Sequence, residues 1–345
     1  MNLTEAPHLD RFFHGILSVA RSEEGILINR MSPAQLAHYS KQAALELRAQ
    51  CAAGVTLELR TDSPWLDMRF RILGRTRPCL GVDVEIDGQV VRSIHSEESG
   101  DTFSERLFDY PKDDQPFRLV RIHFPHNCIL EFQQLSLAPG ATVEPLPPRP
   151  LRLLTLGDSI TQGMDAVSPL APYPVQLARL FNAELLNQGV GGDVFDTGSI
   201  DRTIAYQPHL VTVAYGTNDW SRGCTRSQVT ETARDFVRKL RETCGPDIPI
   251  VVICPLWRDT GETEKAGGTL KAFSEAILDS IRGFENTLAV DGCTLVPHDP
   301  RFFADGTHPN ELGFMHYAVN LFREVLHLRP QLQRHRAETA DREDA

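Results

Sequence analysis

The sequence predicts an α/β fold in two parts: an all-β, jelly-roll-like sandwich domain, then a three-layer α/β/α domain with a parallel sheet. Three observations predict this fold. Short segments with alternating apolar and polar residues fill the N-terminal part, a proline-rich stretch follows, and apolar runs then alternate with helical segments. With 345 residues, of which 41% are hydrophobic, the chain is long enough for two domains with separate cores.

The N-terminal part is expected to contain one short helix at 32–39, with Ser32 as N-cap and Pro33 at the first helical position. Residues 1 to about 20 have no clear pattern. Beyond the helix, apolar residues recur at every second position, which is typical of half-buried strands. The strands expected on this basis are 44–49, 55–60, 66–72, 82–87, 89–91, 103–108, 117–124 and 129–132. Asp87-Gly88 predicts a tight hairpin turn between two of them.

Roughly eight short strands at even spacing, with little helix, indicate a sandwich domain, which we expect at residues 1–143. The charged residues that alternate along these strands are expected to face solvent. His123 and His126 are expected to be surface histidines, because no third ligand stands nearby to complete a metal site.

Prolines at positions 145, 147, 148 and 150 indicate a semi-rigid linker over 144–150, followed by a second domain at 151–330. The expected strands of this domain are 151–156, 183–187, 210–215, 250–254 and 287–290. The expected helices are about 172–182, 197–206, 226–243, 269–284 and 310–328, the last with Asn310 as N-cap. Such alternation predicts a parallel sheet covered by helices on both faces. The charged segment 331–345 is expected to be a disordered tail.

The composition argues against several classes of function. A net charge of −11 without a basic run disfavours nucleic acid or an anionic membrane as the main partner, because an acidic surface repels both. We see no membrane span and no signal peptide, so a cytoplasmic protein is expected. The seven cysteines are scattered, with no Cys-x-x-Cys pair, which disfavours a disulfide framework or a zinc site. We expect buried, reduced side chains.

Four polar segments follow predicted strands or precede the last helix, so all four are expected at the carboxyl edge of the sheet. These segments are Gly157-Asp158-Ser159, 187–193, Gly216-Thr217-Asn218-Asp219 and Asp305-Gly306-Thr307-His308. Ester cleavage by a serine needs a base, a group that orients the base, and donors for the oxyanion. The four segments supply all of these parts.

Ser159 is the candidate nucleophile and His308 the candidate base, because an imidazole can take the hydroxyl proton and return it to the leaving alcohol. Asp305 stands three residues before His308 and can reach the other ring nitrogen across one tight turn. Two other histidines compete as base. His298 lacks a carboxylate at that spacing, and His316 lies inside the last expected helix.

The candidate oxyanion donors are the backbone N–H of Gly192, the side-chain amide of Asn218 and the N–H of Ser159 itself. A plain sharp loop is the alternative for the glycine cluster, which does not match the Gly-x-Gly-x-x-Gly fingerprint of nucleotide loops. A turn after a strand is the alternative for Asn218.

Trp220 and Trp257 are expected in loops at the same edge of the sheet. Either ring could stack on a sugar or an acyl group, although a loop tryptophan more often fills a local packing gap. The proposed chemistry needs neither a metal nor a cofactor.

Together, the four segments resemble the SGNH (GDSL) hydrolase superfamily, and the similarity covers most of residues 151–328. The resemblance implies that Ser159, Gly192, Asn218 and His308 are the four name-giving residues and that Asp305 completes the triad. Most of the resemblance lies in two extended blocks, Gly157-Asp158-Ser159-Ile160-Thr161-Gln162-Gly163 and Asp305-Gly306-Thr307-His308-Pro309-Asn310.

An N-terminal β-sandwich before such a domain is similar to two-domain carbohydrate esterases of family 2 and to the related GDSL acyltransferases of tetracycline biosynthesis. The segment 163–169 resembles the latter group. Family 2 enzymes can lack the triad acid, so the presence of Asp305 favours a full triad here. The contribution of the β-domain stays open.

The resulting expectation is a serine esterase that removes a short acyl group, acetyl first, from a saccharide or another small polyol ester. Acyl transfer to a small-molecule hydroxyl would use the same groups in a drier cleft. A carbohydrate-binding protein with an inactive hydrolase domain is the alternative from another class. The sequence leaves the natural substrate and the oligomeric state open, a homo-oligomer included.

Overall fold

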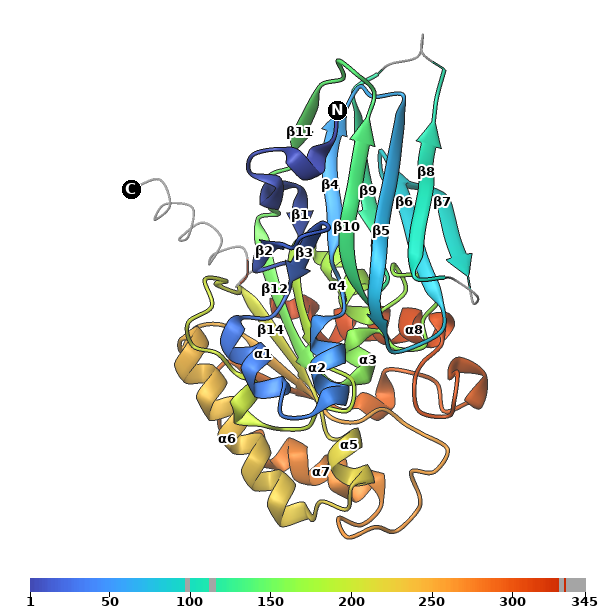
Figure 1. Ribbon diagram of the computed structural model, residues 1–345. Coiled ribbons are helices and arrows are strands. Elements are labelled where there is room, and N and C mark those ends of the chain that lie inside the picture. Colours follow the sequence, from blue (N-terminus) through green and yellow to red (C-terminus); the bar gives the residue numbers. More distant parts are fainter. Residues whose placement is uncertain (97–99, 112–115, 329–331, 333–345) are drawn as a thin grey trace.

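The computed structural model describes residues 1–96, 100–111, 116–328 and 332, and contains two antiparallel sheets and one parallel sheet (Figure 1). The antiparallel sheets belong to the N-terminal part of the chain and the parallel sheet to the C-terminal part. The predicted α/β fold with a preceding β-sandwich is therefore confirmed. The tail predicted at 331–345 lies outside the described residues, apart from Leu332.

The two antiparallel sheets pack face to face around a core of aliphatic and phenylalanine side chains. One sheet has the order β1-β4-β9-β6-β7, with β11 also paired to β4. Its strands are β1 (Phe13–His14), β4 (Thr56–Thr61), β6 (Leu80–Ile86), β7 (Gln89–Ser96), β9 (Arg118–His123) and β11 (Val143–Pro145). The other has the order β2-β3-β10-β5-β8, with β2 (Ser18–Arg21), β3 (Ile26–Asn29), β5 (Trp65–Arg75), β8 (Thr102–Asp109) and β10 (Cys128–Leu137).

The strands predicted from 55 to 132 are confirmed, and so is the turn at Asp87-Gly88, where both residues have positive φ. The N-terminal residues without a clear pattern form the 3-10 turns η1 (Leu3–Glu5) and η2 (Leu9–Phe12) and the first two strands.

The helix α1 (Pro33–Tyr39) has Ser32 as its N-cap and begins at Pro33, as predicted, and Gln35 completes a capping box. The strand expected at 44–49 is wrong: this segment lies in the helix α2 (Ala43–Gln50). Its residues are good helix formers, and Leu45 and Ala49, four positions apart, are its buried residues.

The solvent-facing surface expected on the sandwich is also partly wrong. Glu58, Asp83 and Glu85 are at most 2% exposed, because the second half of the chain covers this sheet. Arg121 bridges Glu58 and Glu85, and Arg149 reaches Glu58 from beyond the sandwich, at 2.8 Å. Glu58 and Glu85 thus form ion pairs, as burial of charge requires.

The two histidines expected at the surface are buried as well. His123 is 5% exposed and His126 is 2% exposed. The carbonyl of His126 accepts a hydrogen bond from the side chain of Gln162 in the second half of the chain, at 3.1 Å. Burial lowers the pKa of His126 to about 4, so this imidazole is neutral at physiological pH.

The parallel sheet has the order β13-β12-β14-β15-β16, and helices cover both of its faces, so the three-layer prediction is confirmed. The strands are β12 (Leu151–Gly157), β13 (Ala183–Gly189), β14 (Leu210–Ala214), β15 (Ile250–Ile253) and β16 (Thr287–Val290). Successive residues of β12 point to opposite faces: Leu153 packs with α4 (Tyr173–Phe181) and α8 (Glu311–Val325), and Leu154 with α6 (Arg226–Cys244) and α7 (Leu270–Ile281).

Four of the five helices predicted for this half are confirmed, and Asn310 caps α8 by accepting from the N–H of Gly313. The helix expected at 197–206 is wrong. Only the 3-10 turn η3 (Thr197–Ser199) forms there, and the following residues run as an irregular segment. Two short helices were not predicted: α3 (Ser159–Gln162) and α5 (Thr217–Ser221).

The N-terminal helices α1 and α2 reach the carboxyl edge of the parallel sheet in Figure 1, where α1 contacts η3 in the segment after β13. The buried Arg30 joins the two halves: its guanidinium donates to the carbonyls of Arg48, Cys51 and Asn187 at 2.6–2.7 Å. Gln35 and Gln188 exchange side-chain hydrogen bonds at 2.9 Å. The N-terminal part is thus built into the edge of the sheet where the candidate site lies.

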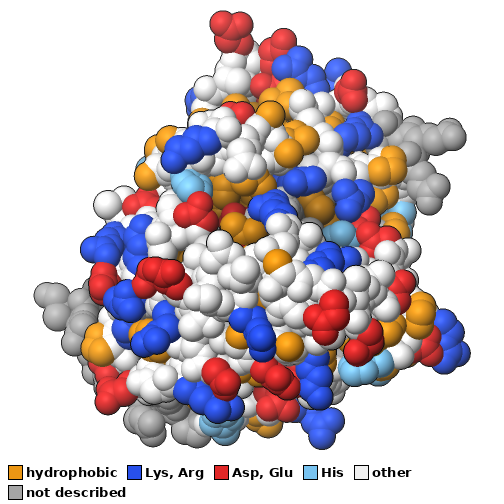
Figure 2. Space-filling model, turned by 90° about the horizontal axis from the view of Figure 1, so that it is seen from below, with side chains coloured by type: hydrophobic (Ala, Val, Ile, Leu, Met, Phe, Trp, Pro, Cys, Tyr) orange, Lys and Arg blue, Asp and Glu red, His pale blue; other side chains and the backbone are white. Residues whose placement is uncertain are grey.

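Acidic and basic side chains are interspersed over the face of the molecule seen in Figure 2. Within the described residues, no helix is long and apolar enough to cross a membrane. All seven cysteines are free; Cys51, Cys128 and Cys254 are buried and the other four are partly exposed.

Candidate active site

The serine predicted as nucleophile lies where β12 gives way to α3. Asp158 caps this helix by accepting from the N–H of Ile160 at 3.0 Å, and Ser159 is its first residue. A Cβ on Gly157 would come within 2.1 Å of the Thr161 hydroxyl, so the sharp turn requires glycine there. The turn leaves Ser159 6% exposed at the end of β12, an inner strand of the sheet.

A continuous chain of hydrogen bonds joins the three predicted catalytic side chains. Nε2 of His308 lies 2.8 Å from Oγ of Ser159, and Nδ1 of His308 lies 2.8 Å from Oδ2 of Asp305. Because a carboxylate only accepts hydrogen bonds, Nδ1 carries the ring proton and Nε2 is left to accept from the serine hydroxyl. This is the tautomer that a general base needs.

The carboxylate of Asp305 is held by its own turn. Its Oδ1 accepts from the N–H groups of Thr307 and His308 at 3.0 and 2.8 Å. Partial burial works to raise the pKa of Asp305, but the N–H and the imidazole of His308 outweigh it, and the pKa lies below its ordinary value. Asp305 is therefore ionised at physiological pH.

The competing bases do not contact the serine. His298 donates its Nε2 hydrogen to the carbonyl of Cys293 at 2.8 Å and stacks on Trp257. His316 lies in α8, with its ring edge against Phe302.

A second carboxylate, which the sequence analysis missed, faces His308. Oδ2 of Asp165 lies 3.1 Å from Nδ1, beside the contact from Asp305. Arg77, in the segment between β5 and β6, donates to both oxygens of Asp165, at 2.6 and 3.1 Å. Asp165 has a φ of +69°, a conformation that costs energy for a residue other than glycine and that these contacts stabilise.

The ligand atoms of Asp165, Asp305 and His308 lie within 4.8 Å of one another, which is close enough for a metal ion. However, Arg77 already neutralises Asp165, and the imidazole N–H lies between the two carboxylates. These contacts fit a doubly held imidazole better than a cation site.

The loop after β13 contains the predicted oxyanion donor Gly192, with a φ of +82°. The carbonyls of three successive residues in this loop each accept a hydrogen bond from a side chain. Arg48 donates to Gly191 at 3.0 Å, Arg222 to Gly192 at 2.5 Å, and Asn218 to Asp193 at 3.0 Å. The loop is thereby fixed from α2, from α5 and from the residue that follows α5.

The predicted donors keep free N–H groups. Among the described residues, no acceptor takes the backbone N–H of Ser159 or of Gly192. Asn218, near the start of α5, donates one amide hydrogen to the carbonyl of Asp193, and its second amide hydrogen is available to another acceptor. These groups are the candidates to receive an oxyanion.

Two buried carboxylates lie beside these groups. Asp193 accepts from the hydroxyls of Tyr39 and Tyr215 at 2.9 and 3.3 Å, and burial raises its pKa to about 7. Burial likewise raises the pKa of Asp158 to about 7. Both groups are therefore partly protonated at neutral pH, which reduces the negative charge near the proposed oxyanion position.

The substrate contact suggested for Trp220 is wrong. Trp220 lies in α5, is 0% exposed and donates its Nε1 hydrogen to the carbonyl of Gly268 at 2.9 Å. It is the packing residue that the alternative described. Trp257 is half-buried and lines a cavity of about 350 Å³ with Arg258 and Leu270 after β15, so its ring stays a candidate for substrate contact.

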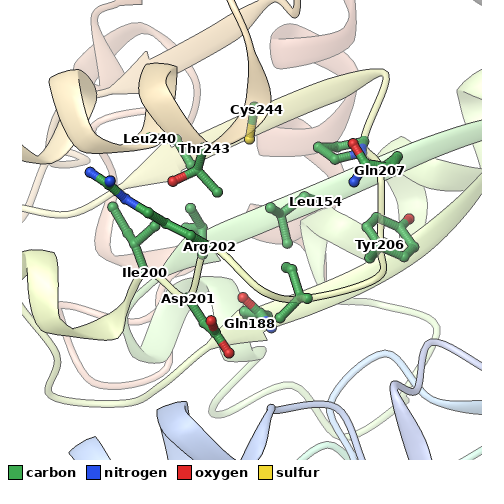
Figure 3. Close-up of a pocket in the computed structure, with 13 residues that line it drawn as sticks. Leu154, Gln188, Ile200, Asp201, Arg202, Tyr206, Gln207, Leu240, Thr243 and Cys244 are labelled. Carbon is green, nitrogen blue, oxygen red and sulfur yellow. The ribbon is translucent and has the colours of Figure 1, made fainter.

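Another cavity, shown in Figure 3, lies between β12 and α6 and is closed by residues 200–208. Its volume is about 30 Å³, roughly that of one water, and none of the predicted site residues lines it. The chemistry therefore does not belong there.

The part of the chain that contains the three-layer fold and these polar segments also matches a known protein family. Residues 155–315 match the model of the GDSL-like Lipase/Acylhydrolase family. The segment 155–315 is thus a GDSL/SGNH hydrolase domain, as predicted from the sequence. No curated protein matches the chain by sequence.

Solved structures with both parts of the chain share the fold. One is the salicylyl-acyltransferase SsfX3 from a tetracycline biosynthetic pathway, with a TM-score of 0.77, 22% identity, and 92% of this chain and 94% of that chain covered. A family two carbohydrate esterase from Cellvibrio japonicus has a TM-score of 0.65 and 17% identity, with 96% and 98% covered. The acetyl xylan esterase Est2A from Butyrivibrio proteoclasticus has a TM-score of 0.64 and 15% identity, with 96% and 99% covered. Both groups named in the sequence analysis are thus structural neighbours.

Proposed function

We propose that the protein is a serine esterase that removes a short acyl group from a carbohydrate or another polyol ester through an acyl-enzyme. Acetyl is the leading candidate for this acyl group. The observation that carries the proposal is the hydrogen-bonded chain from Ser159 through His308 to Asp305. It supplies a nucleophile, a base in the required tautomer and an orienting carboxylate.

In the first step, Oγ of Ser159 attacks the ester carbonyl carbon while Nε2 of His308 takes the hydroxyl proton. The N–H groups of Ser159, Gly192 and Asn218 receive the negative charge that forms on the carbonyl oxygen. The bond to the leaving alcohol then breaks, and the alcohol takes the proton from His308. The product of this step is an acyl ester on Ser159.

In the second step, water gives a proton to His308 and its oxygen attacks the acyl-enzyme. The acid leaves when the bond to Ser159 Oγ breaks and the serine regains its proton. Throughout both steps, Asp305 and Asp165 stabilise the transient imidazolium, because both carboxylates face Nδ1.

A second candidate is acyl transfer to a small-molecule hydroxyl, in which an acceptor alcohol replaces water. The likeness to SsfX3, a salicylyl-acyltransferase, favours it. Hydrolysis is the leading proposal because the side chain of Asp305 is 48% exposed, so water reaches the edge of the site. A carbohydrate-binding protein with an inactive hydrolase half is the remaining alternative, and the hydrogen-bonded triad argues against it.

The test is product analysis with an acetylated sugar, with and without an excess of a second alcohol. Free acetate in both reactions supports the esterase, whereas acetate transferred to the added alcohol supports the acyltransferase. Binding of the sugar without any turnover would favour the binding protein.

A further inference from the structure

Two arginine side chains converge on the loop that contains the proposed oxyanion donor. Arg48 comes from α2 in the N-terminal part, and Arg222 follows α5. If Gly192 carried a Cβ, that atom would lie 3.0 Å from Nη1 of Arg48 and 3.6 Å from Nη2 of Arg222. The two guanidinium groups therefore meet over the Cα of Gly192.

No carboxylate of the described residues forms an ion pair with Arg48 or Arg222. The charge of Asp219 acts on Arg222, but without a direct ion pair. Elsewhere, arginines such as Arg106 and Arg121 each pair with two carboxylates, in a chain that carries an excess of acidic residues. Arg48 and Arg222 lie side by side without such a partner among the described residues.

Arg48 is partly buried, whereas Arg222 is exposed, and their two positive charges repel each other. Partial burial lowers the pKa of Arg48, and the charges of Arg77 and Arg222 lower it further. Arg77 forms an ion pair with Asp165, so Arg48 and Arg222 are the two arginines at this loop without an ion pair to a described carboxylate. Each uses one N–H group on a backbone carbonyl, and a guanidinium has five.

We propose that Arg48 and Arg222 form a subsite for an anionic group of the ester substrate. A carboxylate is the leading candidate for this group. The inference rests on the proposed function, because it assigns the substrate class of that site. A guanidinium fork matches a carboxylate, phosphate or sulfate, and a neutral acetylated sugar would leave both charges unmatched. The anion belongs to the same molecule as the reacting ester, since the two arginines flank the residue that receives the oxyanion.

A simpler role is that the arginines only fix the carbonyls of Gly191 and Gly192. That role predicts equal losses for neutral and anionic esters when an arginine is replaced. The anion subsite predicts a loss confined mainly to anionic esters, so the ratio of the two rates separates the two roles.

The experiment compares matched esters that differ in one charge. Mono-4-nitrophenyl succinate and its methyl ester place the charge on the acyl side, and 4-acetoxybenzoate and its methyl ester place it on the alcohol side. Each kcat/KM is divided by the rate constant of the same ester with hydroxide, which removes intrinsic reactivity. We expect a preference of about tenfold or more for the anionic member of one pair, reduced by added salt.

The variants Arg48→Gln and Arg222→Gln keep a donor for the backbone carbonyl and remove the charge. We expect each to lower the anionic preference by about tenfold, and Arg48→Lys to retain most of it. Arg238→Gln, which removes an exposed arginine of α6 paired with Asp235, is the matched control and should leave the ratio unchanged.

A wild-type ratio of one or below for both pairs, or a ratio that both Gln variants leave intact, would overturn the anion subsite while the esterase stands. If no ester turns over, binding of the same esters to Ser159→Ala by calorimetry decides the inference. Tighter binding of an anionic ester that Arg48→Gln abolishes supports it, and equal binding of the charged and neutral esters contradicts it.

Discussion

Arg77 donates two hydrogen bonds to Asp165, and through this contact the N-terminal sandwich reaches His308, the proposed base. Oδ2 of Asp165 lies 3.1 Å from Nδ1 of His308, so a residue of the first half of the chain helps to position the proposed base of the second half. Arg48 does the same for the oxyanion loop. The sandwich is therefore part of the candidate site, which gives a physical role to the half whose contribution the sequence left open.

The first prediction concerns the two carboxylates that share His308. Because Asp165 also faces Nδ1, Asp305→Ala should lower kcat by only about tenfold to a hundredfold. The double variant Asp165→Ala/Asp305→Ala should lower it by about ten-thousandfold, the cost of an unoriented base. Steady-state kinetics of the two single variants and the double variant checks this. Equal activity of Asp305→Ala and the double variant would show that Asp165 does not help to orient His308.

The second prediction concerns Arg77. Arg77→Gln should lower kcat about as much as Asp165→Ala does, with little change in KM, because each variant removes the same support from His308. In a double-mutant cycle the two effects should not add, since the residues act as one unit. Additive losses would mean that Arg77 acts by another route.

The third prediction concerns the oxyanion donors. Asn218→Ala should lower kcat by roughly a hundredfold or more, because it removes a donor aimed at charge that develops in the transition state. It also removes the hydrogen bond to Asp193, so circular dichroism and the melting temperature must accompany the kinetics. A folded Asn218→Ala with normal kcat would remove this residue from the proposed oxyanion hole.

The fourth prediction concerns acid stability at the junction of the two halves. Burial works to raise the pKa of Glu58, but Arg149, His14 and Arg121 outweigh it and lower the pKa from 4.5 to about 2. A lowered pKa stabilises the folded state above pH 4.5, and this contribution is lost as the pH falls toward 2. Its size is on the order of 3 kcal/mol.

Urea unfolding of the wild type and Glu58→Gln checks this effect. The wild type should have the larger free energy of unfolding at pH 7, and the difference should shrink as the pH approaches 2. Glu144→Gln, at an exposed position of β11, is the control. A difference that stays constant from pH 7 to pH 2.5 would contradict the assignment.

The fold and the triad were predictable from the sequence because their signals are local. Strand periodicity, the cap at Asn310 and the four polar segments each lie within a few neighbouring residues. The helix at 43–50 was missed because alternation over six residues also fits a helix with inward Leu45 and Ala49. The buried positions of Glu58, Glu85 and His126 depend on the second half of the chain, which no pattern within the sandwich reveals.

Asp165, Arg77 and Arg48 could not be assigned for the same reason. Asp165 stands six residues after Ser159, in a segment that was noted for its resemblance alone, and only the fold turns it toward His308. Arg77 and Arg48 lie more than 80 residues before the groups they contact. Trp220 shows the reverse: its place after Asn218 suggested a surface ring, but its side chain points into the core of the second half.

The central claim is that Ser159 is the nucleophile of an esterase. The most direct measurement is the hydrolysis of 4-nitrophenyl acetate and 4-nitrophenyl octanoate by the wild type and by Ser159→Ala, with thermal unfolding of both proteins as the control for folding. We expect release by the wild type with a preference for the acetate, and loss of turnover in a Ser159→Ala protein that unfolds at the wild-type temperature. Near-normal turnover by folded Ser159→Ala would contradict it.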